Sequence, residues 1–441
     1  MNSKFTINFC LLIIIFSCSI SYSDTTSNWK KLSTPISTHL RKVFFVDSLS
    51  GWVGGDSGII IHTNNGGNNW QVQSSGIESE IRDIFFLNNR LGWGIAWSYS
   101  EETPIGSVIL STTNGGSFWR ISDFPEENVF LNCIHFVDSS IGFLGTGNGT
   151  ILRTIDGGIN WEKTKITTGP YSNFPILDFK FITKQFAFAN GGIRDVGGVI
   201  WRTGNFGLDW DSGPVGPEPI LQIDAIDSNY IVGVGGDYEF GAGVVISSDA
   251  GISWDYRSLE IFGFAHSVSF RKPTEGWSTI GIEKKFLLTR DSAKTWEVIP
   301  TIDSTAIYEL QFVDSLTGFA VGERGTVLKY KYKPPIVNSI DDAVLTTPIG
   351  HKLFQNFPNP FNPETVIRYQ LMVNGHVSLK VYDILGREVA TLVDEIKDAG
   401  FYHFPFSIRQ LTDHFPLSNG IYFYQLRAGS YLETRKMIIL K

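Results

Sequence analysis

Short apolar segments, each followed by a polar turn, recur along most of the chain. Their centres lie near Val43, Ile84, Ile134, Phe179, Ile223, Val268 and Leu310. After most of them, a polar turn leads to Gly plus an aromatic residue that opens the next apolar run, as in FVDSLSGW (Phe45–Trp52) and FVDSLTGF (Phe312–Phe319). Runs of this length, bounded by turn residues, are typical of β-strands. The pattern therefore predicts seven pairs of strands in series.

A second element, an eight-residue turn that ends in Trp, occurs six times. Its polar turn residues and tryptophans are Asn65, Trp70, Asn114, Trp119, Asp156, Trp161, Asn205, Trp210, Asp249, Trp254, Asp291 and Trp296. The Asn or Asp side chain accepts N–H groups of its own turn, and a Gly usually supplies the positive φ. Successive tryptophans are 49, 42, 49, 44 and 42 residues apart. This is the repeat length of a β-propeller blade.

Each repeat therefore predicts four strands, and the whole pattern predicts an all-β, seven-bladed β-propeller over residues 24–333. The seventh repeat, through Gly318–Tyr330, has no Trp after it. The missing residue is at the other end, where Trp29 precedes Trp70 by 41 residues. We expect the strand near Trp29 to complete the last blade and close the ring, which removes a free sheet edge.

The eight-residue turn resembles the Asp-box, or bacterial neuraminidase repeat. Two copies depart from it, because Phe206 replaces a Gly and the last copy reads Asp291-Ser292-Ala293. The whole repeat is similar to the propellers named after a photosystem II assembly and stability factor. This resemblance implies the fold and recognition of a partner protein through a basic patch, which Arg41 and Arg82 echo. Asp-boxes also occur in sialidases and xyloglucan-active glycosidases, so function has to be argued from the site.

After Tyr332 the character of the chain changes. Residues 334–351 lack a sustained period and predict a linker. Beyond them, alternation such as Val377, Leu379 and Val381 against polar neighbours predicts strands of a small C-terminal β-sandwich. Residues 352–441 closely resemble the C-terminal sorting domain of the type IX secretion system. The residues that carry this resemblance are Pro358, Asn359, Pro360, Phe361, Gly386, Lys436 and Lys441. It implies that the type IX machinery is a partner and that the protein is secreted or held at the outer-membrane surface.

The N-terminus and the composition agree with export. Residues 1–23 contain a basic residue, an apolar run and a small polar stretch, which predict a signal peptide. An acylated Cys18 is the lipoprotein alternative. Removal of the signal peptide would leave one cysteine, Cys133, so no disulfide framework is expected. The net charge of −8 argues against nucleic acid as a partner.

Loops that break the repeat are the candidate binding positions. They share aromatic and acidic side chains, which are Trp97, Tyr99, Glu101, Glu102, Tyr171, Asp195, Asp237, Tyr238 and Glu239. Topology predicts these loops at one end of the propeller, opposite the regular turns. Variable loops on a rigid scaffold often carry binding. Aromatic platforms beside carboxylates suit a sugar or a cationic peptide, although such aromatics equally often fold back onto the blades.

We therefore predict a non-enzymatic propeller that binds an envelope protein or an extracellular glycan. The alternative is a glycoside hydrolase, whose two carboxylates would come from the acidic loop residues. A sialidase is disfavoured because the arginines are scattered. The histidines show no metal-ligand spacing, so no metal and no cofactor are expected. Cys133 and His135 are explained better by core filling than by nucleophilic catalysis. The ligand, the oligomeric state and the choice between release and anchoring stay open.

Overall fold

The computed structural model describes residues 28–100, 103–167, 169–332, 350–356, 358–361, 364–407 and 418–439. The chain divides after Lys333 into two compact units. The predicted signal peptide, the alternative at Cys18 and most of the predicted linker lie outside the described residues, as do Glu101, Glu102 and Lys441. Within the described ranges, no helix has the length and apolar character needed to cross a bilayer.

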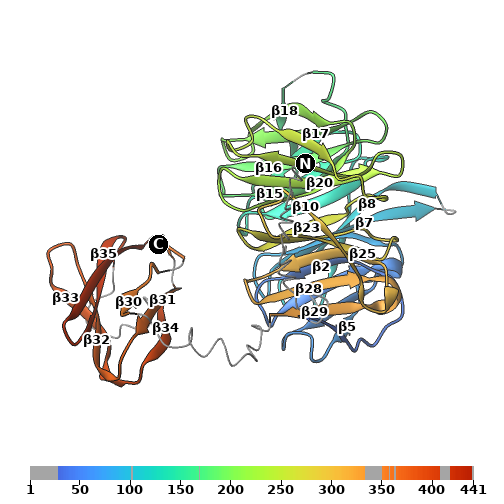
Figure 1. The fold of residues 1–441 in the computed structure, drawn as a ribbon. Coiled ribbons are helices and arrows are strands. Elements are labelled where there is room, and N and C mark those ends of the chain that lie inside the picture. The colour runs from blue at the N-terminus through green and yellow to red at the C-terminus, as the bar shows by residue number, and fades with distance from the viewer. Residues whose placement is uncertain are drawn as a thin grey trace, which may run out of the picture. The chain divides into compact units, whose positions relative to one another are not determined.

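The described strands of the first unit form seven β-sheets (Figure 1). The first three sheets are β2 (Leu40–Phe45), β3 (Gly51–Gly55), β4 (Ile60–Thr63) and β5 (Gln71–Gln73); β6 (Ile81–Phe86), β7 (Gly92–Ser100), β8 (Thr103–Thr112) and β9 (Arg120–Asp123); and β10 (Leu131–Phe136), β11 (Gly142–Thr146), β12 (Ile151–Thr154) and β13 (Glu162–Lys163). The fourth contains β15 (Ile176–Phe181), β16 (Ala187–Ile193), β17 (Gly197–Thr203) and β18 (Asp209–Gly216), with β14 (Lys165–Ile166) added parallel to β18.

The remaining three sheets of this unit are β19 (Ile220–Ala225), β20 (Ile231–Asp237), β21 (Gly241–Ser247) and β22 (Asp255–Ser258); β23 (Ser267–Lys272), β24 (Glu275–Thr279), β25 (Lys285–Thr289) and β26 (Glu297–Pro300); and β27 (Ile307–Phe312), β28 (Thr317–Gly322), β29 (Val327–Lys331) and β1 (Trp29–Leu32). Three short 3-10 helices, η2 (Asp56–Gly58), η3 (Ile302–Ser304) and η4 (Glu323–Gly325), lie in connections.

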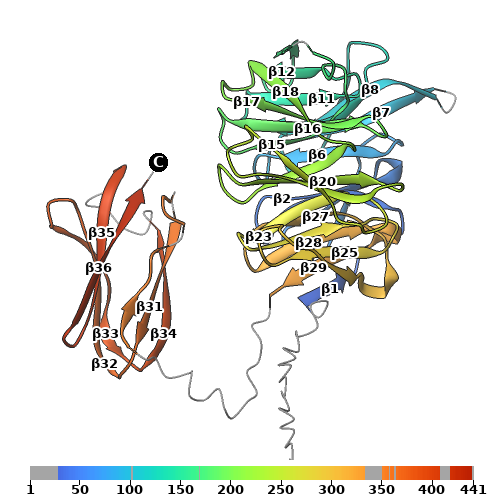
Figure 2. The ribbon, with the colours of Figure 1, turned by 45° about the horizontal axis from the view of Figure 1, so that its top comes forward.

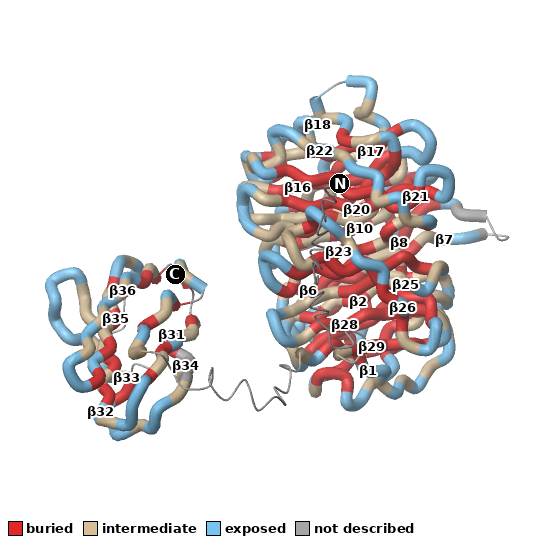
Figure 3. Tube along the Cα trace, in the orientation of Figure 1, coloured by how far each residue is buried: buried red, intermediate tan, exposed pale blue. Residues whose placement is uncertain are grey.

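The sheets are arranged in a ring. Their first strands, β2, β6, β10, β15, β19, β23 and β27, contact one another in chain order, and β27 contacts β2 in turn. Strand β1 pairs antiparallel with β29, with Trp29 opposite Tyr330, so the two ends of the unit share one sheet (Figure 2). Buried residues follow the strands, whereas most of the connections are exposed (Figure 3). The all-β propeller predicted from the repeats is confirmed.

The Gly-aromatic repeat packs each sheet against the next. A Cβ on Gly51 would lie 2.3 Å from the ring of Phe45 on the neighbouring strand, so only Gly fits under that ring. The aromatic residue after the Gly instead meets the next sheet. Trp52 stacks on Phe86 with ring centroids 3.5 Å apart, and Trp93 stacks on Phe136 at 3.6 Å. The motif therefore supplies one stacked aromatic pair to each of these interfaces.

The six Trp-ending turns share one hydrogen-bond pattern. In the first, Thr63 Oγ1 donates to Asn65 Oδ1 at 3.0 Å, Gly67 N–H donates to Thr63 Oγ1 at 2.9 Å, and Asn69 N–H donates to Asn65 Oδ1 at 2.9 Å. The corresponding Ser or Thr and Asn or Asp pairs make the same contacts at 112/114, 154/156, 203/205, 247/249 and 289/291. Where Gly is absent, Ala293 adopts a φ of 67°. The turn geometry therefore outweighs the local preference of the residue.

The Gly207→Ala substitution tests how tightly these turns are packed. Gly207 has a φ of 70°, and an added Cβ would lie 2.2 Å from Phe143, a fully buried ring. We expect a loss of about 3 kcal/mol in the free energy of unfolding, from left-handed strain and overpacking. Gly204→Ala in the same turn is the matched control, because no atom lies within 4 Å of its Cβ position. Urea denaturation followed by tryptophan fluorescence compares the two, and equal losses would contradict the packing argument.

The second unit contains two sheets. One consists of β30 (Lys352–Leu353), β31 (Glu364–Leu371) and β34 (Gly400–Ser407), and the other of β33 (Glu388–Lys397), β32 (Gly375–Tyr382), β35 (Gly420–Ala428) and β36 (Tyr431–Ile439). Residues of both sheets share one hydrophobic cluster, which includes Ile367, Leu379, Tyr424 and Met437. This is the small sandwich that the alternating pattern predicts. Within it, Asn359 Oδ1 accepts the N–H of Ile438, and Phe361 N–H donates to the carbonyl of the same residue, which ties the Pro-rich entry to the last strand.

Two ends of the propeller follow from this topology. The turns after the first strands and the Trp-ending turns lie at one end, because consecutive strands of each sheet are antiparallel. The connections between the second and third strands, and those between successive sheets, lie at the other end. We call this second end the loop face, and the candidate binding loops belong to it.

Candidate functional site

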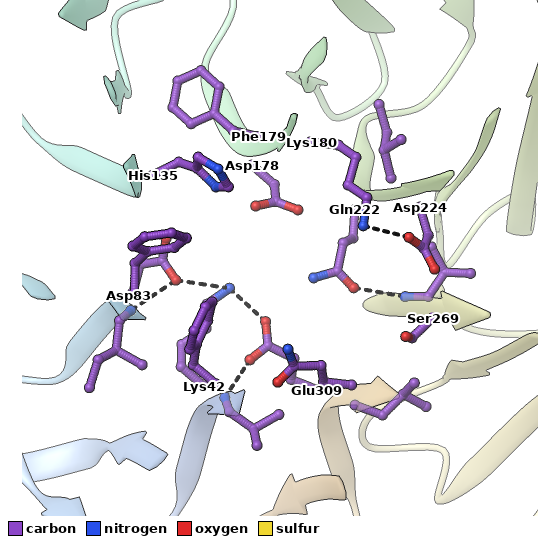
Figure 4. A pocket seen from close by; sticks show the side chains of 18 of the residues that line it. Lys42, Asp83, His135, Asp178, Phe179, Lys180, Gln222, Asp224, Ser269 and Glu309 are labelled. Carbon is purple, nitrogen blue, oxygen red and sulfur yellow. Dashed lines mark hydrogen bonds and ion pairs between the residues drawn. The ribbon is translucent and has the colours of Figure 1, made fainter. Parts of the chain in front are cut away.

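The innermost strands turn polar side chains toward the ring centre. In six of them the pairing shifts register just before one residue: Lys42, Asp83, Cys133, Asp178, Gln222 and Glu309. Such an irregularity re-aims a side chain without ending the strand. Lys42, Asp83, Asp178, Gln222 and Glu309 line a cavity of about 180 Å³ together with His135, Lys180, Asp224 and Ser269 (Figure 4). We call this space the channel cavity.

Several of these side chains accept a backbone N–H of the next sheet. Asp83 Oδ2 accepts from Ile134 at 2.8 Å, Gln222 Oε1 accepts from Val268 at 2.8 Å, and Glu309 Oε2 accepts from Val43 at 2.6 Å. A buried backbone N–H without a partner costs about 1–3 kcal/mol. The polar ring therefore stabilises the contacts between neighbouring sheets.

The channel cavity holds more acidic than basic groups. Lys42 Nζ lies 2.9 Å from Glu309 and 3.9 Å from Asp83, and Lys180 Nζ lies 2.6 Å from Asp224. Asp178 makes no ion pair within 4.0 Å among the described residues. Burial raises the pKa of Asp83 to about 6 and that of Asp178 to about 7. The cavity therefore takes up protons near neutral pH rather than holding every carboxylate charged.

Two other titratable groups of strand β10 are kept neutral. Burial, helped by the charge of Lys180, lowers the pKa of His135 to about 3, and its ring stacks on Phe181 at 4.6 Å. Burial also raises the pKa of the Cys133 thiol well above its usual value. A nucleophilic cysteine needs its thiolate, which this environment disfavours. The geometry agrees with core filling at Cys133.

At the loop face the channel widens into a hollow of about 480 Å³, which we call the mouth. Its lining comes from the start of inner strands and from loops, and consists of Arg41, Arg82, Tyr238, Phe264, His266, Tyr308, Glu80 and Ile282, together with Lys42 and Glu309. Lys42 and Glu309 also line the channel cavity, so the two spaces adjoin each other. The sequence therefore brings basic, aromatic and acidic groups together at one opening.

The guanidinium of each arginine of the mouth lies over an aromatic ring. The guanidinium of Arg41 is 4.6 Å from the centroid of Tyr308, and its Nε donates to Asp56 at 2.8 Å. The guanidinium of Arg82 is 4.4 Å from the centroid of Trp97. Stacking and ion pairing hold a planar guanidinium in one orientation while leaving further N–H donors available.

The structure distributes the predicted loop residues over several environments. Tyr238 lines the mouth, whereas Trp97 lies under the guanidinium of Arg82, and its Nε1 donates to the carbonyl of Leu131 at 2.9 Å. Tyr99 and Glu239 are exposed. Tyr171 packs on Phe174, with ring centroids 5.7 Å apart, against the core around Trp210. Asp237 is buried, and its Oδ1 accepts the N–H groups of Glu239 and Phe240 in its own loop.

Asp195 and Asp237 lie together with a third carboxylate, that of Glu218. One oxygen from each of the three residues lies within 4.8 Å of the others. Burial and the neighbouring carboxylates raise the pKa of Glu218, although the N–H of Asp195 donates to it. In the part of the chain that the structure describes, this is the single group of three acidic, His or Cys side chains close enough to share a cation. The sequence pattern did not indicate it.

Sequence reasoning also missed the channel. Its charged residues lie within short apolar strands, as in LRKVFF (Leu40–Phe45) and IRDIFF (Ile81–Phe86), where Lys42 and Asp83 each follow an arginine. Lys42 and Asp83 face the ring centre because the pairing irregularity that precedes each of them re-aims its side chain. The usable signal was the recurrence of a polar residue at one register position of the predicted inner strands.

Comparisons with known proteins agree with this architecture. Residues 355–440 match the family described as the secretion system C-terminal sorting domain, and residues 22–120 match the photosynthesis system II assembly factor YCF48 family. The photosystem II stability/assembly factor HCF136 of Arabidopsis thaliana is 27% identical over 243 residues, covering 51% of this chain and 59% of that protein. The photosystem II assembly lipoprotein Ycf48 of Nostoc sp. is 24% identical over 343 residues, covering 73% and 92%.

Solved structures share the fold. YCF48 bound to D1 peptide superposes with a TM-score of 0.56 at 19% identity, covering 71% of this chain and 99% of that one. The GH74 xyloglucanase of Xanthomonas campestris superposes with a TM-score of 0.55 at 12% identity, covering 78% and 59%. At these identities the likeness concerns the fold. The chain therefore carries a propeller domain like that of the YCF48 photosystem II assembly factors, followed by a type IX secretion system C-terminal sorting domain.

Proposed function

We propose that this protein is exported by the type IX secretion system and binds an extended segment of an envelope or extracellular protein at the mouth of its propeller. The observation that carries the proposal is the pair of stacked arginines. Arg41 and Arg82 present oriented N–H donors around a hollow large enough for several side chains. Peptide carbonyls and carboxylates are the acceptors that such donors recognise.

The same geometry favours a peptide over a glycan. A sugar ring needs an open aromatic face on which to stack. Arg82 covers one face of Trp97, and Arg41 covers one face of Tyr308. The similar fold of YCF48, solved with a D1 peptide, supports this manner of recognition.

The glycoside hydrolase alternative has less support at the mouth. Its carboxylates are Glu80 and Glu309, and each is already paired, with Arg82 at 3.0 Å and Lys42 at 2.9 Å. A retaining or inverting pair would need one ionised carboxylate and one protonated carboxyl group facing a substrate. The other candidates for this role are acidic loop residues: Glu101 or Glu102, which lie outside the described residues, paired with Asp195, Asp237 or Glu239.

Substitution of Arg82 by alanine tests the proposed function. The probe is an array of overlapping peptides from outer-membrane and secreted proteins of the source cell, with affinities of retained peptides measured by fluorescence polarisation on the full chain. We expect Arg82→Ala to weaken binding by at least 30-fold, about 2 kcal/mol, as for a buried anchoring arginine. Arg120→Ala, an exposed arginine on β9, is the matched control and should leave the affinity unchanged.

A glycan array run with the same full chain gives the opposing outcome. Retention of a glycan that is lost in Trp97→Ala but kept in Arg82→Ala would contradict the proposal and assign the site to carbohydrate. Release of sugar from any glycan would instead support the hydrolase alternative. Loss of peptide binding in Arg82→Ala and Arg120→Ala alike would show that the arginine at the mouth has no specific role.

A further inference from the structure

Asp178 departs from the pattern of the polar ring. Asp83, Gln222 and Glu309 occupy the same register position on their strands, and each accepts a backbone N–H of the next sheet. Asp178 follows the same irregularity on β15, but no N–H of the next sheet donates to it among the described residues. The side chain points into the channel cavity, with no hydrogen bond or ion pair drawn to its carboxylate (Figure 4).

The charge around Asp178 is unbalanced. The titratable groups that face it are His135 on β10, Lys180 on its own strand, Asp224 on β19 and, across the channel, Lys42, Asp83 and Glu309. Both ammonium groups already contact other carboxylates. His135 is neutral, because burial holds its pKa near 3. The cavity therefore holds four carboxylates, of Asp83, Asp178, Asp224 and Glu309, but only two ammonium groups, and Asp178 has no cation within 4.0 Å among the described residues.

The cavity also has room and access for a ligand group. Its volume of about 180 Å³ is several times the roughly 30 Å³ that a water molecule occupies in the liquid. Gln222 accepts through Oε1, so its amide N–H₂ is turned toward the cavity. The mouth shares Lys42 and Glu309 with this space, so a segment bound at the mouth lies next to it.

We infer that Asp178 receives the primary ammonium group of a lysine side chain, which the partner segment bound at the mouth extends into the channel cavity. The inference rests on the proposed function, since the docked segment supplies the lysine. The new contact is an ion pair between the lysine Nζ and one carboxylate oxygen of Asp178.

The arrangement favours an ammonium over other cations. A metal ion needs several oxygen ligands converging on one point, and the described channel residues contain no such group of three. A guanidinium pairs best with both oxygens of a carboxylate. Because the cavity beside Asp178 is small, an ammonium, which acts as a compact point charge, fits it better than a planar guanidinium does.

Proton release gives this contact a distinctive signature. The pKa of Asp178 is raised to about 7 by burial, so about half of the side chains are protonated at pH 7. An ammonium beside the carboxylate stabilises the charged form and lowers that pKa. Binding at pH 7 should therefore release about half a proton for each ammonium bound, and less at pH 8.5.

Calorimetric titration of the full chain with N-acetyl-lysine methylamide tests the inference. Titrations at pH 7 in two buffers of different ionisation enthalpy measure the protons released. N-acetyl-norleucine methylamide, which lacks the charge, is the matched ligand control, and NaCl and KCl test inorganic ions. We expect saturable binding of the lysine amide with proton release, and at least a tenfold loss of affinity in Asp178→Asn. Asp123→Asn, an exposed carboxylate on β9, is the matched variant and should bind as the parent chain does.

Each outcome decides the inference. Equal heats from the lysine and norleucine amides, unchanged affinity in Asp178→Asn, or no binding at all would overturn it. Competition by Na⁺ or K⁺ at equal concentration would overturn the ammonium assignment and make the cavity an inorganic cation site. Tryptophan fluorescence of Asp178→Asn checks that the variant is folded. A peptide whose affinity depends on Arg82 could bind equally well when its lysine is replaced by norleucine. That result would overturn this inference and leave the proposed function intact.

Discussion

Replacing Trp29 by alanine lowers the free energy of unfolding of the propeller by about 3–5 kcal/mol, the cost expected for truncating a large buried aromatic residue. Trp29 is 4% exposed, although it belongs to the first described strand of the chain. Its ring stacks on Phe286 with centroids 5.3 Å apart and contacts Tyr330 edge-on at 5.2 Å. Truncation removes these contacts and weakens the pairing of β1 with β29.

Urea denaturation followed by tryptophan fluorescence measures this effect cleanly. All 12 tryptophans lie between residues 29 and 296, so the signal reports the propeller and not the sorting domain. Lys30→Ala on the same strand is the control, because its side chain is exposed and the change should stay within about 0.5 kcal/mol. Trp29→Phe should be milder than Trp29→Ala, since Trp29 Nε1 makes no hydrogen bond among the described residues. If Trp29→Ala left the free energy of unfolding unchanged, closure of the propeller by β1 would contribute little to stability.

Replacing Lys42 by methionine should also be strongly destabilising. At pH 8 we expect it to lower the free energy of unfolding by about 3–5 kcal/mol, as for a buried ion pair that loses one partner. Lys42 lies between Glu309 and Asp83, and it is the cation nearest to both. Burial alone would lower the pKa of Lys42, but the charges of Glu309 and Asp83 outweigh burial and raise it. The ammonium is therefore fully charged from pH 5 to pH 8, where the parent chain keeps its stabilising effect.

The loss of stability caused by Lys42→Met should be smaller at pH 5 than at pH 8. The pKa of Asp83 is raised in the folded chain to about 6, mainly by burial and despite the charge of Lys42, so the folded state binds more protons than the unfolded state between about pH 4 and pH 6. Stability therefore falls as pH rises through this window. Without Lys42 the pKa of Asp83 rises further, so the fall in stability is larger in total and continues to higher pH. At pH 5 Asp83 is protonated, so less uncompensated charge remains.

Urea denaturation at pH 5 and pH 8 compares the two chains. Lys42→Met combined with Glu309→Gln should recover part of the loss, because the uncompensated carboxylate is removed as well. Lys163→Met is the matched control, since the pair it forms with Glu126 is exposed and should contribute less than about 1 kcal/mol. Equal losses for Lys42→Met at both pH values would assign its role to packing rather than charge.

Much of the fold was predictable because its determinants are local. The Ser or Thr, Asx and Gly pattern defines a turn within eight residues, and the observed turns use those side chains, as Thr63 and Asn65 show. The Gly-aromatic motif likewise reflects contacts that each repeat makes with its neighbour. The C-terminal sandwich followed from alternation along single strands, of which Val377, Leu379 and Val381 are the buried half.

The all-β propeller and its sorting domain could be predicted from local sequence, because each repeat contains the residues of its own turn and one ring of an aromatic stack. Local sequence also indicated Trp97 and Tyr238 at the loop face. Which charged side chains meet depends on the tertiary structure. Lys42 and Glu309 are 267 residues apart in the chain and 2.9 Å apart in space, and Arg41, Arg82 and Tyr308 converge on one mouth for the same reason. Ring closure brings the first and last sheets together, and no local pattern records which side chains then face each other across the channel.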